Sequence, residues 1–161
     1  MPVPVDPQAA QIYAADRAHV FHSWSAQAAL DPLVITGAEG CHVIDGDGRR
    51  LLDFSSQLVF TNIGHQHPKV IAAIAEQAAT LCTIAPAHAN AARSRAAELI
   101  IDVAPEGFSK VFFTNGGADA AENAIRMARL TTGRYKTLSA FRGYHGGTQQ
   151  AINLTGDPRR W

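Results

Sequence analysis

Apolar residues recur every three to four positions in four stretches of the chain, and this spacing predicts four amphipathic helices. We expect these helices at about residues 7–22, 68–81, 90–103 and 116–132. The first follows Asp6, a residue type that favours helix starts, and the last ends at Gly133, where a left-handed cap is common. A further short helical stretch is expected after the sequence RGYHGGT.

Between the helices, shorter apolar runs bounded by turn residues predict strands of two kinds. Residues 33–54 contain two turns rich in Gly and Asp, at 37–40 and 45–48, and so predict a small antiparallel meander. Residues 110–115 and 136–141 are apolar runs on either side of the last long helix. Strand, helix and strand in this order form a βαβ unit, which predicts a parallel sheet and an α/β fold. Sheets usually have about four to six strands, so the predicted sheet is unfinished.

Composition narrows the class of protein. Hydrophobic residues make up 47% of the 161 residues and charged residues 17%, which favours one globular domain over disorder. Fourteen basic and fourteen acidic side chains cancel, whereas a nucleic-acid binder would carry a basic excess. Cys41 and Cys82 lie far apart, in no metal or redox spacing, which favours a reducing compartment. No secretory signal or membrane-spanning run is visible, so we expect a cytoplasmic protein.

The first candidate site is the sequence from Phe113 to Ala118, FTNGGA. A predicted strand ends there, two glycines permit a tight turn, and a predicted helix begins. The free backbone N–H groups and the positive end of the helix dipole form an anion site at such a point. The sequence is neither a Walker loop nor a dinucleotide-binding fingerprint. A plain tight turn without a ligand is the alternative interpretation.

The second candidate site follows the next predicted strand, at residues 142–147, RGYHGG. The carboxyl ends of neighbouring parallel strands share one crevice, so the topology places Tyr144 beside Gly117. An aromatic ring next to a phosphate site favours stacking on a flat ligand ring. The alternative is that Tyr144 only packs beneath a loop.

Four sequence blocks together resemble the class III aminotransferases. FTNGGADAAENAIRMAR is similar to the family block F-T-N-S-G-S-E-A-N-E-x-A-x-K-x-A-R, and YHGGT is similar to the block Y/F-H-G. Upstream, G-x-x-x-x-D-x-x-G-R-x-x-x-D-F fits residues 40–54, and N-x-G-H-x-H-P fits residues 62–68. The blocks lie in order over most of residues 35–155. The resemblance is nearest to the ω-transaminases, which pass an amino group from an amine or ω-amino acid to a 2-oxo acid such as pyruvate.

The resemblance implies a cofactor, pyridoxal 5′-phosphate (PLP), and a set of residues that bind it. The backbone amides of Gly117 and Ala118 would hold the phosphate, with Gly116 beside them, and Tyr144 would stack on the pyridine ring, followed by His145. The family often carries a hydroxyl at the position of Ala118 and serine at that of Gly116, so one phosphate hydrogen bond would be missing here.

The resemblance also implies a fold, a partner and a substrate pocket. Residues 1–60 would be the N-terminal segment and part of the small domain, and residues 61–161 the first part of the PLP-binding large domain of a fold-type I transferase. That domain has a mostly parallel sheet with helices on both faces, and the enzymes are homodimers. The pocket for the amine donor and the 2-oxo acid, near the dimer interface, would be lined by Leu58, Val59 and Phe60.

The chain lacks a residue that transamination requires. A lysine amine must form a Schiff base with the cofactor and move a proton, but the three lysines, Lys69, Lys110 and Lys136, match no family lysine. The family lysine and the aspartate that pairs with the pyridine nitrogen lie downstream. We therefore identify no catalytic residue and predict that the 161-residue chain alone is inactive. Two alternatives remain, a phosphate-binding or PLP-binding module without chemistry and a truncated dimerisation fragment.

Other polar residues fit structural roles better than chemical ones. His65, His67 and His88 have loose spacing and no carboxylate or cysteine to complete a metal site, so we expect no bound metal. Glu122 lies early in a predicted helix, where negative charge is stabilising, and we expect it to pair with Arg126 four residues on.

Overall fold

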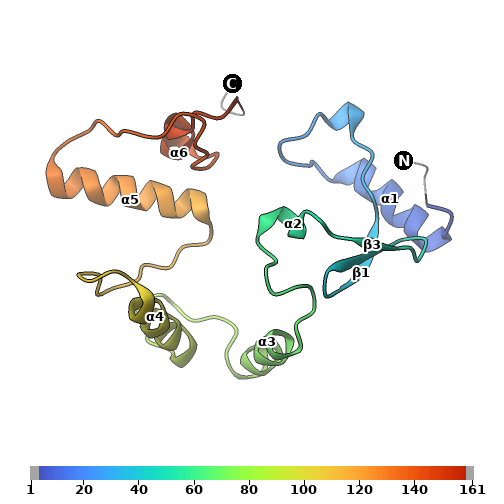
Figure 1. Cartoon of the computed structure of the whole chain (residues 1–161), viewed down its shortest axis with the longest axis horizontal. Coiled ribbons are helices and arrows are strands. Elements are labelled where there is room, and N and C mark those ends of the chain that lie inside the picture. Colours follow the sequence, from blue (N-terminus) through green and yellow to red (C-terminus); the bar gives the residue numbers. More distant parts are fainter. Residues whose placement is uncertain (1–3, 159–161) are drawn as a thin grey trace. The chain divides into compact units, whose positions relative to one another are not determined.

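The computed structural model describes residues 4–158 and divides into two compact units, Met1–Ala85 and Pro86–Trp161 (Figure 1). The first unit opens with helix α1, Pro7–His19, followed by the short 3₁₀ helix η1, Gln27–Ala29. Asp6 caps α1, because its Oδ1 accepts the Ala9 N–H at 2.9 Å. The helix ends three residues earlier than the sequence predicts, since the backbone of Val20 is already extended.

A three-stranded antiparallel sheet follows, in the order β1-β2-β3, and it confirms the predicted meander. The strands are β1, Ile35–Glu39, β2, His42–Asp45, and β3, Arg50–Leu52. Helix α1 packs on the turn after β2, where Ala9 is buried and a Cβ placed on Gly46 would lie 2.4 Å from the Ala9 Cβ. Glycine is therefore required at that turn for the helix to approach.

Two helices complete the first unit, α2, Ser56–Val59, and α3, Pro68–Thr80. Helix α3 begins at Pro68, as predicted, because proline is tolerated in a first helical turn. Helix α2 is irregular, since Gln57 has φ +65° and Val59 has φ +68°. Positive φ is strained for a β-branched residue such as valine.

The second unit contains three helices, α4, Ala91–Val103, α5, Gly117–Thr132, and α6, Gln149–Leu154. Asn90 caps α4 by accepting the Arg93 N–H at 2.9 Å, and Gly133, with φ +67°, ends α5 in the predicted left-handed cap. Helix α6 packs against α5, and both are orange to red in Figure 1. The small apolar core of this unit contains Ile125 and Ala151.

The expected parallel sheet is not formed within residues 4–158. Neither residues 110–115 nor residues 136–141 form a strand, and the antiparallel β1-β2-β3 is the only sheet there. A strand exists only when a neighbour completes its hydrogen-bond ladder, and consecutive strands of a parallel sheet need not be neighbours. The meander has its partners close in sequence, whereas the two apolar runs have none among the described residues. The predicted domain boundary after residue 60 stays a prediction.

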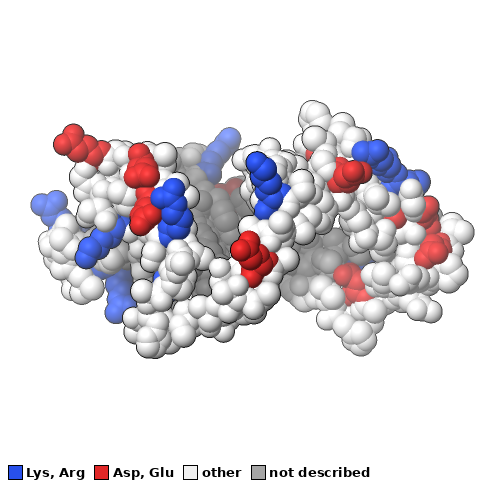
Figure 2. All heavy atoms as spheres, turned by 90° about the horizontal axis from the view of Figure 1, so that it is seen from below, with Lys and Arg blue, Asp and Glu red and all other residues white. Residues whose placement is uncertain are grey.

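Two further features of the structure are its surface charge and the hydropathy of its helices. Figure 2 shows basic and acidic side chains interspersed among uncharged ones on the face in view. None of the helices within residues 4–158 combines the length and the hydropathy needed to cross a bilayer.

Candidate functional site

The N-terminus of helix α5 presents unused backbone donors. Gly116 precedes the helix in an extended conformation, and Gly117 and Ala118 are its first two residues. The first N–H groups of a helix have no partner within it, and those of Gly117 and Ala118 donate no hydrogen bond in the described chain. A Cβ placed on Gly116 or Gly117 would meet nothing within 4 Å, so the approach to these amides is open. Sixteen residues of helix add their dipole.

The structure brings the second candidate loop directly onto this helix start. Gly146 has φ +129°, and a Cβ placed on it would lie 2.6 Å from the Ala118 Cβ and 2.8 Å from the Ala118 Cα. No other residue type fits such an approach without displacement. The two candidate loops therefore meet at Gly146 and Ala118, and the placement of Tyr144 beside Gly117, like its binding role, stays a prediction.

Tyr144 and His145 lie in this loop and differ in exposure. Tyr144 is partly exposed, with 44% of its surface accessible. The backbone N–H of His145 donates to the Thr155 Oγ1 at 3.1 Å, which fixes its backbone. The Nε2 of its ring is buried and has no hydrogen-bond partner among the described residues. A buried polar atom without a partner is energetically unfavourable, which makes this nitrogen a candidate contact for a ligand.

The predicted substrate-pocket residues belong to the first unit, in and directly after α2. Leu58, Val59 and Phe60 are all exposed large hydrophobic side chains. Of the three, only Val59 has a strained backbone, with φ +68°, and such strain persists only where the surrounding structure or a function maintains it. Their place in a substrate pocket stays a prediction.

His65 has partners within the first unit. Its Nε2 lies 2.7 Å from the Asp53 Oδ2, and its backbone pairs with Gly40 in a β-bridge. The hydrogen bond from His65, with a second from the Ser55 hydroxyl, lowers the pKa of Asp53 to about 2, although partial burial opposes this. No group of three His, Cys, Asp or Glu residues within 4–158 is arranged to hold a metal.

The Asp-x-x-Gly-Arg block also serves the fold. Asp45 is buried, and its carboxylate accepts hydrogen bonds from the Arg49 Nε at 2.6 Å and from the Arg49 and Asp47 backbone amides. Burial raises the pKa of Asp45, but the hydrogen bonds from Arg49 and Asp47 outweigh it and the net pKa is lowered. Gly48, with φ +80°, allows the turn. This block closes the β2–β3 hairpin.

Glu122 has partners that the sequence interpretation missed. It forms no ion pair with Arg126 in the described chain, so the expected pair is wrong. Its Oε1 instead accepts hydrogen bonds from Thr148, Gln150 and Ala151 at the start of α6. No local pattern could reveal these contacts, because they join residues 26 to 29 positions apart.

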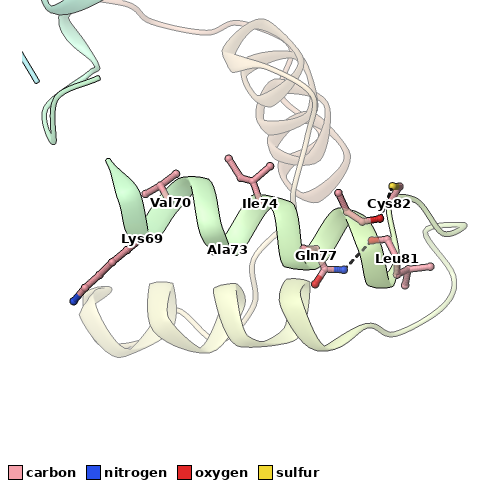
Figure 3. A pocket seen from close by; sticks show the side chains of 8 residues that line it. Lys69, Val70, Ala73, Ile74, Gln77, Leu81 and Cys82 are labelled. Carbon is pink, nitrogen blue, oxygen red and sulfur yellow. Dashed lines mark hydrogen bonds between the residues drawn. The ribbon is translucent and has the colours of Figure 1, made fainter. Parts of the chain in front are cut away.

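A groove of about 580 Å³ runs along α3 in the first unit (Figure 3). It is lined mostly by apolar residues of α3 and of the two positions that follow it, among them Val70, Ile74 and Leu81. The hydrogen bonds drawn in Figure 3 join residues at the end of the helix, such as that from the Gln77 Nε2 to the Leu81 oxygen at 2.8 Å. It holds none of the predicted cofactor residues and offers no convergent polar groups.

Comparison with known proteins shows which family the chain resembles. The sequence profile of Aminotransferase class-III matches residues 24–160. Acetylornithine aminotransferase from Methanopyrus kandleri is 34% identical over 127 residues, which are 79% of this chain and 33% of that protein. The 5-aminovalerate aminotransferase from Pseudomonas putida is 36% identical over 129 residues, which are 79% of this chain and 30% of that protein.

Solved structures agree with the sequence matches. A taurine:2-oxoglutarate aminotransferase from Bifidobacterium kashiwanohense, in complex with PLP and glutamate, superposes with a TM-score of 0.89 at 45% identity, covering 93% of this chain and 34% of that one. An S-selective transaminase from Arthrobacter sp., with alanine bound, gives a TM-score of 0.83 at 33% identity, covering 90% and 32%. The chain spans about a third of the length of these relatives. It belongs to the class III aminotransferase family.

Proposed function

We propose that the protein acts in PLP-dependent transamination, in which an amino group passes from an amine or ω-amino acid to a 2-oxo acid such as pyruvate. One observation supports this most strongly. The loop of Tyr144 and His145 closes, through Gly146, on a helix start whose Gly117 and Ala118 amides are open. In a family whose solved members include a PLP complex, this is the arrangement that a phosphorylated aromatic cofactor needs.

The residues present fit the cofactor. The N–H groups of Gly117 and Ala118 would bind its phosphate together with the positive end of the α5 dipole, and Gly116 keeps the approach open. The Tyr144 ring would stack on the pyridine ring, and the buried His145 Nε2 would gain the polar partner that it lacks. When bound, PLP supplies the electron sink on which transamination depends.

Within these 161 residues we propose cofactor binding without turnover. Lys69, Lys110 and Lys136 are all exposed, whereas a lysine that loses its proton easily is desolvated. The chain would then contribute the phosphate site, the stacking tyrosine and, through Leu58, part of a substrate pocket near a homodimer interface. The alternative is a truncated fragment that serves only in dimerisation, which would also be inactive but would bind no PLP.

A pair of proline substitutions tests the phosphate site. Gly117→Pro removes one N–H at the first position of α5, where proline is tolerated, and the extended Gly116 is compatible with a following proline. Ala91→Pro is the matched control, at the first position of α4 after the extended Asn90. Losing one charge-assisted hydrogen bond of about 1.5–3 kcal/mol should weaken PLP binding about 10- to 100-fold.

PLP affinity is measured by equilibrium dialysis on protein of verified intact mass, with pyridoxal as the ligand that lacks phosphate. Equal affinity of the wild type for PLP and pyridoxal, or an unchanged affinity in Gly117→Pro, would contradict the site. The same samples are then assayed with pyruvate and a panel of amines. Turnover by a verified 161-residue species would overturn the expected lack of activity.

A further inference from the structure

The carboxylate of Glu122 anchors the start of helix α6. Its Oε1 accepts hydrogen bonds from the Thr148 hydroxyl at 2.7 Å, the Gln150 N–H at 2.6 Å and the Ala151 N–H at 3.1 Å. Thr148 precedes α6 but its side chain makes no capping bond of its own. Glu122, which lies one turn beyond Ala118 on α5, therefore supplies the cap from a different helix.

The charge of Glu122 suits this role. The hydrogen bond from Thr148 is the main cause that lowers the pKa of Glu122, burial opposes it, and the amides of Ala151 and Gln150 add to the lowering. The carboxyl group is thus ionised at neutral pH. Charge-assisted hydrogen bonds of this kind are stronger than those between neutral groups.

The other end of α6 is tied to the loop that carries Tyr144. Thr155 is fully buried and follows α6, and its Oγ1 accepts the His145 N–H at 3.1 Å while donating to the Ala151 oxygen at 2.9 Å. One residue later, the Gly156 N–H donates to the Gly143 oxygen at 2.9 Å. Helix α6 and this loop are therefore joined at two points.

The loop also packs directly against both α5 and α6. A Cβ placed on Gly146 would lie 3.1 Å from the Ala151 Cβ as well as 2.6 Å from that of Ala118. Ala151 is fully buried and also donates to Glu122. The position of the loop on α5 thus depends on the position of α6, and Glu122 fixes the start of α6.

We propose that Glu122 is a positioning residue, which holds α6 and through it sets where Tyr144 and His145 stand relative to the Gly117 and Ala118 amides. Its effect on cofactor binding rests on the proposed function, whereas its effect on the loop does not. The two parts can therefore fail separately.

Amide hydrogen exchange on the full chain without cofactor tests the positioning itself. Glu122→Ala should accelerate exchange at Gln150, Ala151 and His145 by at least about tenfold, because each amide loses a fixed acceptor or a fixed neighbour. Glu122→Gln keeps an acceptor oxygen and should restore most of the protection. Glu98→Ala is the control, an exposed carboxylate on α4 that bonds only Arg95. Faster exchange confined to Gln150 and Ala151, with His145 unchanged, would overturn the proposal.

Thr155 provides a second variant with nearly unchanged volume. Thr155→Val removes the hydroxyl that accepts the His145 N–H, so exchange should rise at His145 but not at Gln150. Thr155→Ser keeps the hydroxyl and should behave as the wild type. If Thr155→Val leaves His145 protected, the connection between α6 and the loop is wrong, whatever Glu122 does.

Cofactor binding gives the second readout. With PLP added, Glu122→Ala should weaken affinity about tenfold and alter the circular dichroism induced in the cofactor absorption band, while Glu122→Gln recovers both. A wild type that binds no PLP would contradict the proposed function. The hydrogen-exchange measurements would then be the test of the positioning role. A wild type that binds PLP, with an unchanged dichroism band and affinity in Glu122→Ala, would refute the positioning role at the site.

Discussion

The two units differ in whether the polar groups of their motifs have hydrogen-bond partners within the chain. In the first unit the polar members bind one another, Asp45 to Arg49 and Asp53 to His65. In the second unit the motif around Gly117 leaves backbone amides open, and the His145 Nε2 is buried without a partner in the described chain. Both sets of residues belong to blocks of the same family.

The contrast separates folding motifs from binding motifs. A polar group whose hydrogen bonds are satisfied within the chain has little left to offer a ligand, whereas buried or clustered donors without partners lower their free energy when a ligand arrives. His67 is the exception in the first unit, since its Nδ1 is also buried without a partner in the described residues. The comparison leads to four predictions, given from the largest expected effect to the smallest.

Gly146→Ala should have the largest effect, because its Cβ collides with the Ala118 Cα and Cβ. We expect it to lower the free energy of unfolding by about 1–3 kcal/mol more than a substitution that strains the backbone without a collision. Gly107→Ala is that control, since Gly107 has φ +96° and open space around it. Urea unfolding of both variants measures the difference, and equal losses would mean that the two loops are not in contact.

Asp53→Asn should destabilise the first unit, because it removes the charge that the partly buried His65 binds. The control is Glu98→Gln, which alters an exposed ion pair with Arg95 and should leave the urea midpoint nearly unchanged. PLP affinity should be the same in both variants, since neither residue lies in the proposed site. A loss of PLP binding in Asp53→Asn at full stability would break the distinction between folding and binding motifs.

The same carboxyl group should give the first unit a characteristic acid dependence. The folded-state pKa of Asp53, about 2, lies below the ~3.9 of an unfolded chain. Its stabilising contribution is therefore complete above pH ~4 and is lost as the pH falls through about 2. The difference in unfolding free energy between wild type and Asp53→Asn should shrink over that range. A difference that stays constant with pH would exclude the lowered pKa.

Ala118→Ser should have the smallest effect and the opposite sign. A hydroxyl at the second residue of α5 adds a donor beside the Gly117 amide, and one hydrogen bond of about 0.5–1.5 kcal/mol strengthens PLP binding about 2- to 10-fold. Ala124→Ser, on an exposed position of the same helix, is the control. Tighter binding of pyridoxal by the same factor would show that the hydroxyl does not act on the phosphate.

Local signals account for the parts that the sequence predicted well. The meander forms as predicted and its second turn follows residue 45, but Gly37–Glu39, predicted as a turn, pair within β1, and the chain turns at Gly40 and Cys41. Gly133 ends α5 as its type predicts. Residues 110–115 carry a strand pattern, but a ladder needs neighbours that no local pattern supplies. Helical spacing predicts that Glu122 pairs with Arg126, whereas its hydrogen-bond partners lie at the start of another helix. Contacts between distant segments are what periodicity cannot show.

The most direct test of the account follows backbone amide resonances while PLP is added to isotope-labelled protein. The account predicts that the largest shifts occur at Gly117 and Ala118, with smaller ones at Tyr144 and His145, and that pyridoxal without phosphate leaves the first two unmoved. Amides around the Asp53–His65 pair should stay in place. Shifts centred on the α3 groove near Ile74, or none at Gly117 and Ala118 at saturation, would contradict the central claim.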